Sequence, residues 1–221
     1  MKRFDYSSIV VPLEFKVACT INKLNIQQVL QIFMDHVSLY DSLTNEYSEG
    51  FTEATKAVSI YVLSKEKQRK PSKSFDKCKD LAINCISGII QLIKMKEGSL
   101  EERRMKSSPQ ITSLYKSMVR YYTPVDRIHL DEDLSISLSR DFCIACEMHS
   151  CYPKELLEYF MSRISLADEH ARLGLKLLEQ NHPYALFLRI SEGFENDVTK
   201  VPELTDLEMD FYFSHYQNMT S

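Results

Sequence analysis

Glycine is scarce in this chain, which has five glycines among its 221 residues. Average usage would give about 15. The five stand apart from one another, at positions 50, 88, 98, 174 and 193. A dinucleotide-binding turn or a phosphate-binding P-loop needs clustered glycines, because only then can the backbone approach the phosphates closely. The scarcity therefore argues against a nucleotide-binding α/β enzyme.

The chain also lacks a long apolar run and an export signal. No uninterrupted apolar stretch approaches the roughly 18 residues of a membrane span. The N-terminal MKRFDYSSIVVPLEFK contains no sustained apolar segment of the signal-peptide type. Six cysteines without an export signal indicate free thiols in a reducing compartment. We therefore expect a cytoplasmic protein that has no membrane partner.

Apolar residues at helical spacing dominate what the sequence does contain. Hydrophobic residues make up 44% of the chain, and most of them recur in steps of three and four, the period of an amphipathic helix. The stretch 7–13 is the only plausible strand, and Pro12 limits it. The sequence therefore predicts an all-α protein, a bundle of about ten helices.

The first long apolar face runs from Ile26 to Tyr47 and predicts one helix of about six turns, which Asn25 can cap. Gly50 interrupts the pattern, and a second apolar face follows over 51–62. The third helix is predicted to open at Ser74. Its apolar stripe consists of Phe75, Cys78, Ala82, Cys85, Ile89, Leu92 and Met95.

Two further helices are predicted after Gly98, which suits a helix C-terminus. Ser99 and Glu102 have the spacing of a capping box, which predicts the start of the first of them. That helix is predicted to stop before Pro109, since proline lacks the N–H group that a helix interior needs. A separate helix is expected over 110–122.

The C-terminal half is predicted to continue as helices joined by short connections. Residues 121–135 are expected to form a loop, because Pro124 and a cluster of acidic residues interrupt the apolar pattern. Helices are then predicted over 134–150, after Pro153, after Ser165, over 183–192 and after Thr205.

Charge is divided unevenly along the chain. Residues 1–110 hold 17 Lys and Arg against 13 Asp and Glu, a net of +4, whereas residues 111–221 hold 10 against 18, a net of −8. Polarity is highest near 97–109. We therefore predict two helical subdomains packed together, a basic one over 1–98 and an acidic one over 99–221.

The basic excess is concentrated in 65–79, KEKQRKPSKSFDKCK, which has seven basic and two acidic residues. A dense positive segment of this kind is typical of nucleic-acid contact, and a solvated loop between helices is the alternative. The candidate contact residues are Lys65, Lys67, Arg69, Lys70, Lys73, Lys77 and Lys79. Lys94, Lys96, Arg103, Arg104 and Lys106 would add to the same positive field.

Residues 15–35 resemble a helix-turn-helix in the spacing of small and apolar residues. The matching positions are Cys19, Leu24, Val29 and Ile32, and Lys23 stands where the turn usually has glycine. Glutamine can read adenine in the major groove, and the other face of the second helix carries Gln27, Gln28 and Gln31. The order strand, helix, helix is also similar to a ribbon-helix-helix. Two ordinary amphipathic helices of a bundle are the alternative.

Four zinc-competent side chains lie within nine residues, namely Cys143, Cys146, His149 and Cys151. Thiolate and imidazole are the donors that zinc prefers. Structural zinc sites usually combine two separated pairs of ligands, however, and on a continuous helix His149 would point away from the first two cysteines. Burial of small cysteines in the core is therefore the alternative to a zinc site.

No catalytic residue can be assigned, because no set of residues in the sequence forms a recognisable catalytic motif. We predict a non-catalytic intracellular scaffold or regulatory protein that acts through contacts with a protein partner or with further copies of itself. Two alternatives stay open. One is a nucleic-acid-binding accessory protein that uses 65–79, and the other is a metal-binding helical protein or enzyme.

Overall fold

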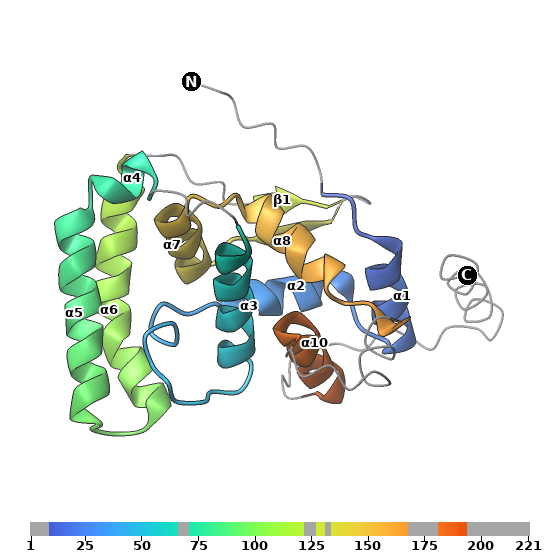
Figure 1. The fold of residues 1–221 in the computed structure, drawn as a ribbon, viewed down its shortest axis with the longest axis horizontal. Coiled ribbons are helices and arrows are strands. Elements are labelled where there is room, and N and C mark those ends of the chain that lie inside the picture. The colour runs from blue at the N-terminus through green and yellow to red at the C-terminus, as the bar shows by residue number, and fades with distance from the viewer. Residues whose placement is uncertain (1–8, 66–70, 122–126, 131–133, 168–180, 194–221) are drawn as a thin grey trace.

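The computed structural model describes residues 9–65, 71–121, 127–130, 134–167 and 181–193. These ranges form helices and one small two-stranded sheet, so the prediction of an all-α protein is confirmed (Figure 1). In the described ranges, every helix is too short or too polar to cross a membrane. The helices predicted after Ser165 and after Thr205 fall largely or wholly outside the described residues.

The helices are α1 (Leu13–Ile21), α2 (Ile26–His36), α3 (Phe51–Ser64), α4 (Lys73–Asp76), α5 (Lys79–Met95), α6 (Leu100–Met118), α7 (Arg140–His149), α8 (Pro153–Ser162) and α10 (His182–Glu192). The strands are β1 (Arg127–His129) and β2 (Ser135–Ser137). Figure 1 shows α5 and α6 as an antiparallel pair at one end of the molecule, with α1 and α10 toward the other end and α3 and α7 between them.

The larger hydrophobic core is formed by α1, α2, α3, α8 and α10. Aromatic rings fill its centre. Phe33 of α2 stacks on Phe160 of α8 with ring centroids 4.1 Å apart, and Phe15 of α1 meets Phe160 edge-on at 6.3 Å. Such ring pairs contribute about 0.5–1.5 kcal/mol beyond the burial of their area. The three rings hold α1, α2 and α8 together.

α2 ends at His36, so the predicted helix from Ile26 to Tyr47 is wrong in its second half. The predicted cap is confirmed, because the Asn25 side chain accepts a hydrogen bond from the Gln28 N–H. The chain continues as turns instead of helix until Gly50, whose φ of +74° precedes the first turn of α3.

Side chains from distant helices stabilise the turns over 37–50. Thr55 Oγ1 accepts a hydrogen bond from the Ser38 N–H at 3.1 Å, and the Asp141 carboxylate accepts one from the Leu39 N–H at 2.9 Å. Because these bonds satisfy buried backbone groups, Leu39 can be buried without a helix around it. Apolar periodicity is therefore misleading in this segment.

The smaller hydrophobic core is formed by α4, α5, α6 and the turns over 37–50. Its buried members are Leu39, Tyr40, Phe75, Cys78, Ala82, Cys85, Ile89, Ile111, Leu114, Met118 and Ile144. Most of the stripe predicted for the third helix is among them. The helix begins earlier than predicted, because Ser72 rather than Ser74 accepts from the Phe75 N–H, and a turn then separates α4 from α5.

The turn between α5 and α6 has the predicted capping box, but α5 ends at Met95 with the left-handed Lys96 as its cap, two residues before Gly98. Gly98 has a φ of +80°, a conformation that glycine adopts without a steric penalty. The Ser99 side chain accepts from the Glu102 N–H at 3.1 Å, while the Glu102 carboxylate accepts from the Ser99 N–H at 2.9 Å. The predicted capping box is confirmed.

α6 continues through Pro109, so the two helices predicted on either side of that residue are a single helix. A proline inside a helix costs about 3 kcal/mol, mainly through one lost backbone hydrogen bond. Pro109 lies on the exposed face of α6, whereas Ser107, Ile111 and Leu114 are buried. Packing of the buried face on both sides of the proline offsets this cost.

β1 lies in the stretch predicted as a loop over 121–135, and β2 lies at the start of the helix predicted over 134–150, which begins instead at Arg140. They pair antiparallel, with Ile128 opposite Ile136, and both side chains are buried. The predicted strand at 7–13 contributes one bridging residue, Ile9, which pairs with Leu130. Three-residue strands are too short for an alternating pattern to be recognised in a sequence.

Two arginines of α6 bind the turns over 37–50. Arg103 is 5% exposed, and its Nε donates to Tyr40 Oη at 3.0 Å. Arg104 donates to the Asp41 carboxylate through Nε at 2.7 Å and stacks over the Phe51 ring. Both guanidinium groups are engaged inside the fold, so they do not add to a surface positive field as the sequence suggested.

The predicted division between residues 98 and 99 falls in the turn between α5 and α6. These two helices pack against each other and share the smaller core. The division into a basic subdomain over 1–98 and an acidic subdomain over 99–221 stays a prediction.

Candidate functional site

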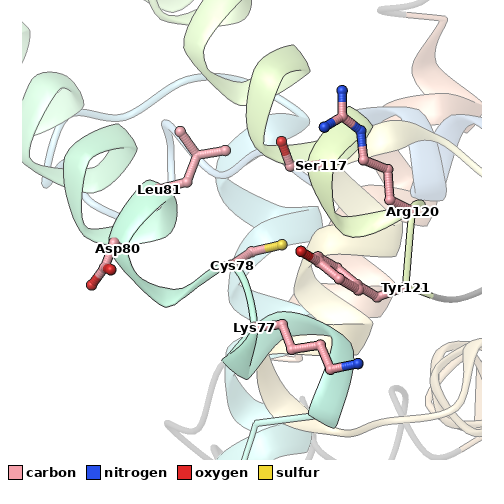
Figure 2. A pocket seen from close by; sticks show the side chains of 7 residues that line it. All are labelled: Lys77, Cys78, Asp80, Leu81, Ser117, Arg120 and Tyr121. Atoms are coloured by element: carbon pink, nitrogen blue, oxygen red, sulfur yellow. The ribbon is translucent and has the colours of Figure 1, made fainter.

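A small hollow lies where the α4–α5 turn meets the C-terminal end of α6, and we call it the α4–α6 pocket (Figure 2). Its volume is about 250 Å³, and it is lined by Lys77, Cys78, Asp80, Leu81, Ser117, Arg120 and Tyr121. The Ser72 N–H donates to the Glu147 carbonyl at 3.0 Å, which attaches the start of α4 to α7. This bond fixes the start of α4, in the described part of the basic segment, against α7.

Two cationic side chains, Lys77 and Arg120, line the α4–α6 pocket. The Lys77 ammonium lies 4.8 Å from the centre of the Tyr121 ring, a cation–π contact worth about 0.5–1 kcal/mol at an exposed site. In the part of the chain that the structure describes, neither cation forms an ion pair. Figure 2 shows the Asp80 carboxylate pointing away from both. The pocket is therefore electropositive.

Cys78 lines the same pocket as the two cations. Burial raises the pKa of its thiol, and the charge of Arg120 partly opposes this shift. A raised pKa keeps the thiol protonated near neutral pH, whereas a reactive cysteine is a thiolate. Cys78 therefore contributes an uncharged side chain to the lining of the pocket.

The basic residues predicted from 65–79 are found in different settings. Lys73, Lys77 and Lys79 are exposed. Lys65 follows α3, and its ammonium lies 4.4 Å from the centre of the Tyr61 ring. Lys67, Arg69 and Lys70 lie outside the described residues.

Sequence reasoning missed Arg120 and Tyr121. They lie more than forty residues after Lys77 along the chain, and only the α5–α6 hairpin brings them beside it. The signal available in the sequence was a basic residue followed by an aromatic one at the predicted end of a helix.

The glutamines proposed for base recognition connect α2 to β2. Gln27 Nε2 donates to the Ser135 carbonyl at 2.6 Å, and Gln31 Nε2 donates to the Ser137 carbonyl at 3.0 Å. Gln31 also accepts from the Ser137 N–H at 3.0 Å. Gln28 is half-buried near the cap of α2. The amides of Gln27 and Gln31 thus satisfy backbone groups of β2.

The proposed zinc ligands lie in and just after α7. Cys143, Cys146 and Cys151 are buried free thiols, and burial raises the pKa of Cys146 well above its ordinary value. Burial also lowers the pKa of His149. Within the described ranges, no three His, Cys, Asp or Glu side chains gather into a group that could hold a metal ion. The four residues are therefore not brought together as a ligand set.

The outer flank of α5 carries a row of isoleucines that the two cores leave partly uncovered. Ile83 is 51% exposed and Ile90 is 36% exposed, Ile86 between them is half-buried, and Ile93 beyond them is half-buried and packs against the smaller core. The steps of three, four and three residues place all four on one flank of the helix. We call Ile83, Ile86, Ile90 and Ile93 the α5 isoleucine stripe.

The two exposed members of the α5 isoleucine stripe, Ile83 and Ile90, lie on the flank of α5 away from α6. Gly88 lies on the opposite flank of α5, where an added Cβ would collide with the Gln110 side chain of α6. In Figure 1, α5 forms the outer edge of the molecule. Sequence reasoning missed the stripe because it adjoins the buried face of the same helix. The signal in the sequence was that apolar residues cover a wider face of α5 than packing against one core requires.

A shallow hollow of about 500 Å³ lies on α6 and is lined by Met105, Ser108, Pro109 and Thr112. Met105 is 68% exposed there. None of these four lining residues is ionisable, so they provide no acidic, basic or charged side chain.

Comparisons of the chain with protein-family models, with curated proteins and with solved structures find no match.

Proposed function

We propose that the protein is a non-catalytic intracellular contact protein, a scaffold or regulator, that binds a protein partner through the α5 isoleucine stripe. The exposure of Ile83 and Ile90 is the observation that carries this proposal. Covering apolar surface contributes about 25 cal/mol per Å², so a partner seated on the stripe would gain from each isoleucine it removes from water.

Polar residues border the α5 isoleucine stripe. Lys79 precedes it, and Ser87 and Lys94 are exposed beside it. An apolar centre with a polar rim is the usual composition of a protein interface. The six cysteines, all buried and free, are consistent with a cytoplasmic protein whose thiols stay reduced.

Photo-crosslinking tests the proposal. A benzophenone amino acid placed at Ile83 should give adducts of defined mass in the native cells, because the partner covers that position. The same group at Gln91, which is exposed on the polar face of α5, is the matched control. Equal adduct formation at both positions, or none at Ile83, would contradict a contact role for the stripe.

Nucleic-acid binding at the α4–α6 pocket is a second candidate function. The observation that favours it is the pair of cations, Lys77 and Arg120, beside the half-exposed ring of Tyr121. Positive side chains bind phosphates, and an exposed ring can stack on an unpaired base. The exposed Lys73 and Lys79 extend the positive surface.

Fluorescence anisotropy with labelled single-stranded and duplex DNA tests the second candidate. If it holds, binding should weaken steeply with salt, and Lys77→Glu with Arg120→Glu should abolish it. Lys106→Glu, an exposed residue nearer the other end of α6, should change the affinity by less than about twofold. Absence of binding at low salt would remove nucleic acid as a partner.

A further inference from the structure

We infer that the partner on the α5 isoleucine stripe is a second copy of this chain, paired with its own α5 running antiparallel to the first. This inference rests on the proposed function, since it takes the stripe to be a contact surface. It adds the identity of the partner and the alignment of the two helices.

The spacing of the four isoleucines, in steps of three, four and three residues, is the same when the helix is read in either direction. In an antiparallel pair with its two-fold axis near Gly88, Ile83 of one copy comes opposite Ile93 of the other. Ile86 likewise comes opposite Ile90, so that each apolar position meets another apolar position. A two-fold interface needs a surface that is complementary to itself, and spacings of three and four are those of paired helices.

The charged residues at the two ends of the stripe are also placed symmetrically about position 88. Lys79 lies four residues before Ile83, and Glu97 lies four residues after Ile93. Both are exposed, and neither forms an ion pair within the described ranges. Lys79 is the first residue of α5, whereas Glu97 lies in the turn just past its end, after the left-handed Lys96. The antiparallel pair therefore brings Lys79 of one copy toward the turn that carries Glu97 of the other, twice per dimer. A parallel pair would instead oppose Lys79 with Lys79 and Glu97 with Glu97, which is repulsive.

The position of α5 in the fold leaves room for this pairing. α5 forms the edge of the molecule, with α6 on its opposite flank (Figure 1). The contact spans about two heptads, and an interface of that size is smaller than a standard stable one. The dimer is therefore expected to be weak, with a Kd in the micromolar range.

Sedimentation velocity over a concentration series, from about 5 to about 500 µM, tests self-association. The protein should shift from monomer to dimer with concentration. Ile83→Glu with Ile90→Glu should weaken the dimer at least about tenfold, because charges would replace the apolar centre. Asn84→Glu with Gln91→Glu adds the same charges at exposed positions off the stripe and should leave the dimer within about twofold.

Charge exchange tests the antiparallel alignment. Lys79→Glu alone and Glu97→Lys alone should each weaken the dimer about fivefold, since each creates two repulsive contacts. The chain with both substitutions should recover the original affinity within about twofold, because the opposite charges meet again in exchanged places. Failure of the double variant to recover would overturn the antiparallel alignment.

The crosslinking at Ile83 separates this inference from the proposed function. A monomer at every concentration, with an Ile83 adduct that contains a different protein, would overturn the second copy as partner and keep the stripe as a contact surface. A monomer with no Ile83 adduct would overturn both. A dimer whose Ile83 adduct has twice the mass of the chain supports both.

Discussion

The Asp41 side chain is 1% exposed, and the guanidinium of Arg104 balances its charge. Arg104 also donates to Ser48 Oγ at 2.6 Å and stacks over the Phe51 ring, 3.8 Å from its centre. Removing one partner of a buried ion pair leaves the other charge uncompensated, and this is far more costly than losing an exposed pair. The turns over 37–50 therefore depend on α6.

Arg104→Ala should lower the free energy of unfolding by about 3 kcal/mol, because Asp41 would stay buried without a cation. Urea unfolding followed by circular dichroism measures the change. Lys106→Ala, an exposed residue of the same helix, should alter the free energy by less than about 0.5 kcal/mol. Equal effects of the two substitutions would contradict the role given to Arg104.

Two half-buried histidines predict how stability depends on pH. Burial lowers the pKa of His149 below its ordinary 6.5, and burial followed by the charge of Lys56 lowers that of His182. Below pH 6.5 the unfolded chain therefore binds more protons than the folded chain, so stability falls as the pH drops through and below that value and is regained above it.

The histidine prediction can be checked by urea midpoints between about pH 7.5 and about pH 5.5. His149→Gln should reduce the loss of stability on acidification, because one of the two protonating groups is gone. His129→Gln, at an exposed position of β1, is the control. A pH dependence that His129→Gln removes and His149→Gln leaves intact would refute the assignment.

At the scale of elements, local signals located helix ends well. The Asn25 cap and the Ser99–Glu102 capping box are where the sequence predicts them, whereas the cap of α5 is Lys96, two residues before the predicted Gly98. Each depends on hydrogen bonds or backbone conformation within four residues, so the sequence contains all that is needed.

Ser99→Ala tests the capping box that begins α6. The substitution should cost about 1 kcal/mol of unfolding free energy, because the Glu102 N–H loses its side-chain acceptor. Thermal or urea unfolding reads the effect. Ser113→Ala, an exposed position within α6, should instead be neutral or slightly stabilising because alanine favours helix interiors. A destabilisation at Ser113 as large as at Ser99 would count against the cap.

The elements that were predicted wrongly depend on contacts between distant residues. α2 ends at His36 because Thr55 and Asp141 stabilise the turns that follow. α6 passes Pro109 because buried residues on both sides keep it packed. Sequence periodicity records which residues are apolar, and it does not record whether a helix or a turn buries them.

The candidate site shows the same limit. Lys77 and Lys79 were predicted from a local charge cluster, whereas Arg120 and Tyr121 reach the α4–α6 pocket only through the α5–α6 hairpin. The α5 isoleucine stripe could not be separated from the buried face of α5 until α6 was placed. Sequence reasoning therefore identified the lysines of this region, whereas Arg120 and Tyr121 could be identified only from the fold.

At the scale of the whole molecule, two cores meet across the turns over 37–50, and the α4–α6 pocket and the α5 isoleucine stripe both lie at the α5–α6 end. The α4–α6 pocket offers positive charge, and the α5 isoleucine stripe offers apolar surface. Figure 1 places both on the side remote from α1 and α10. We therefore expect partners to approach this end of the molecule.

The accessibility of a single engineered thiol tests most directly whether the stripe is a contact surface. The six native cysteines are buried, so Ile83→Cys would be the reactive thiol of the folded chain, with Gln91→Cys as the exposed control. Maleimide labelling should be fast for both in dilute purified protein. In concentrated native extract, the account predicts that labelling at position 83 slows at least about tenfold while position 91 is unchanged. Equal labelling rates at the two positions in the extract would contradict it.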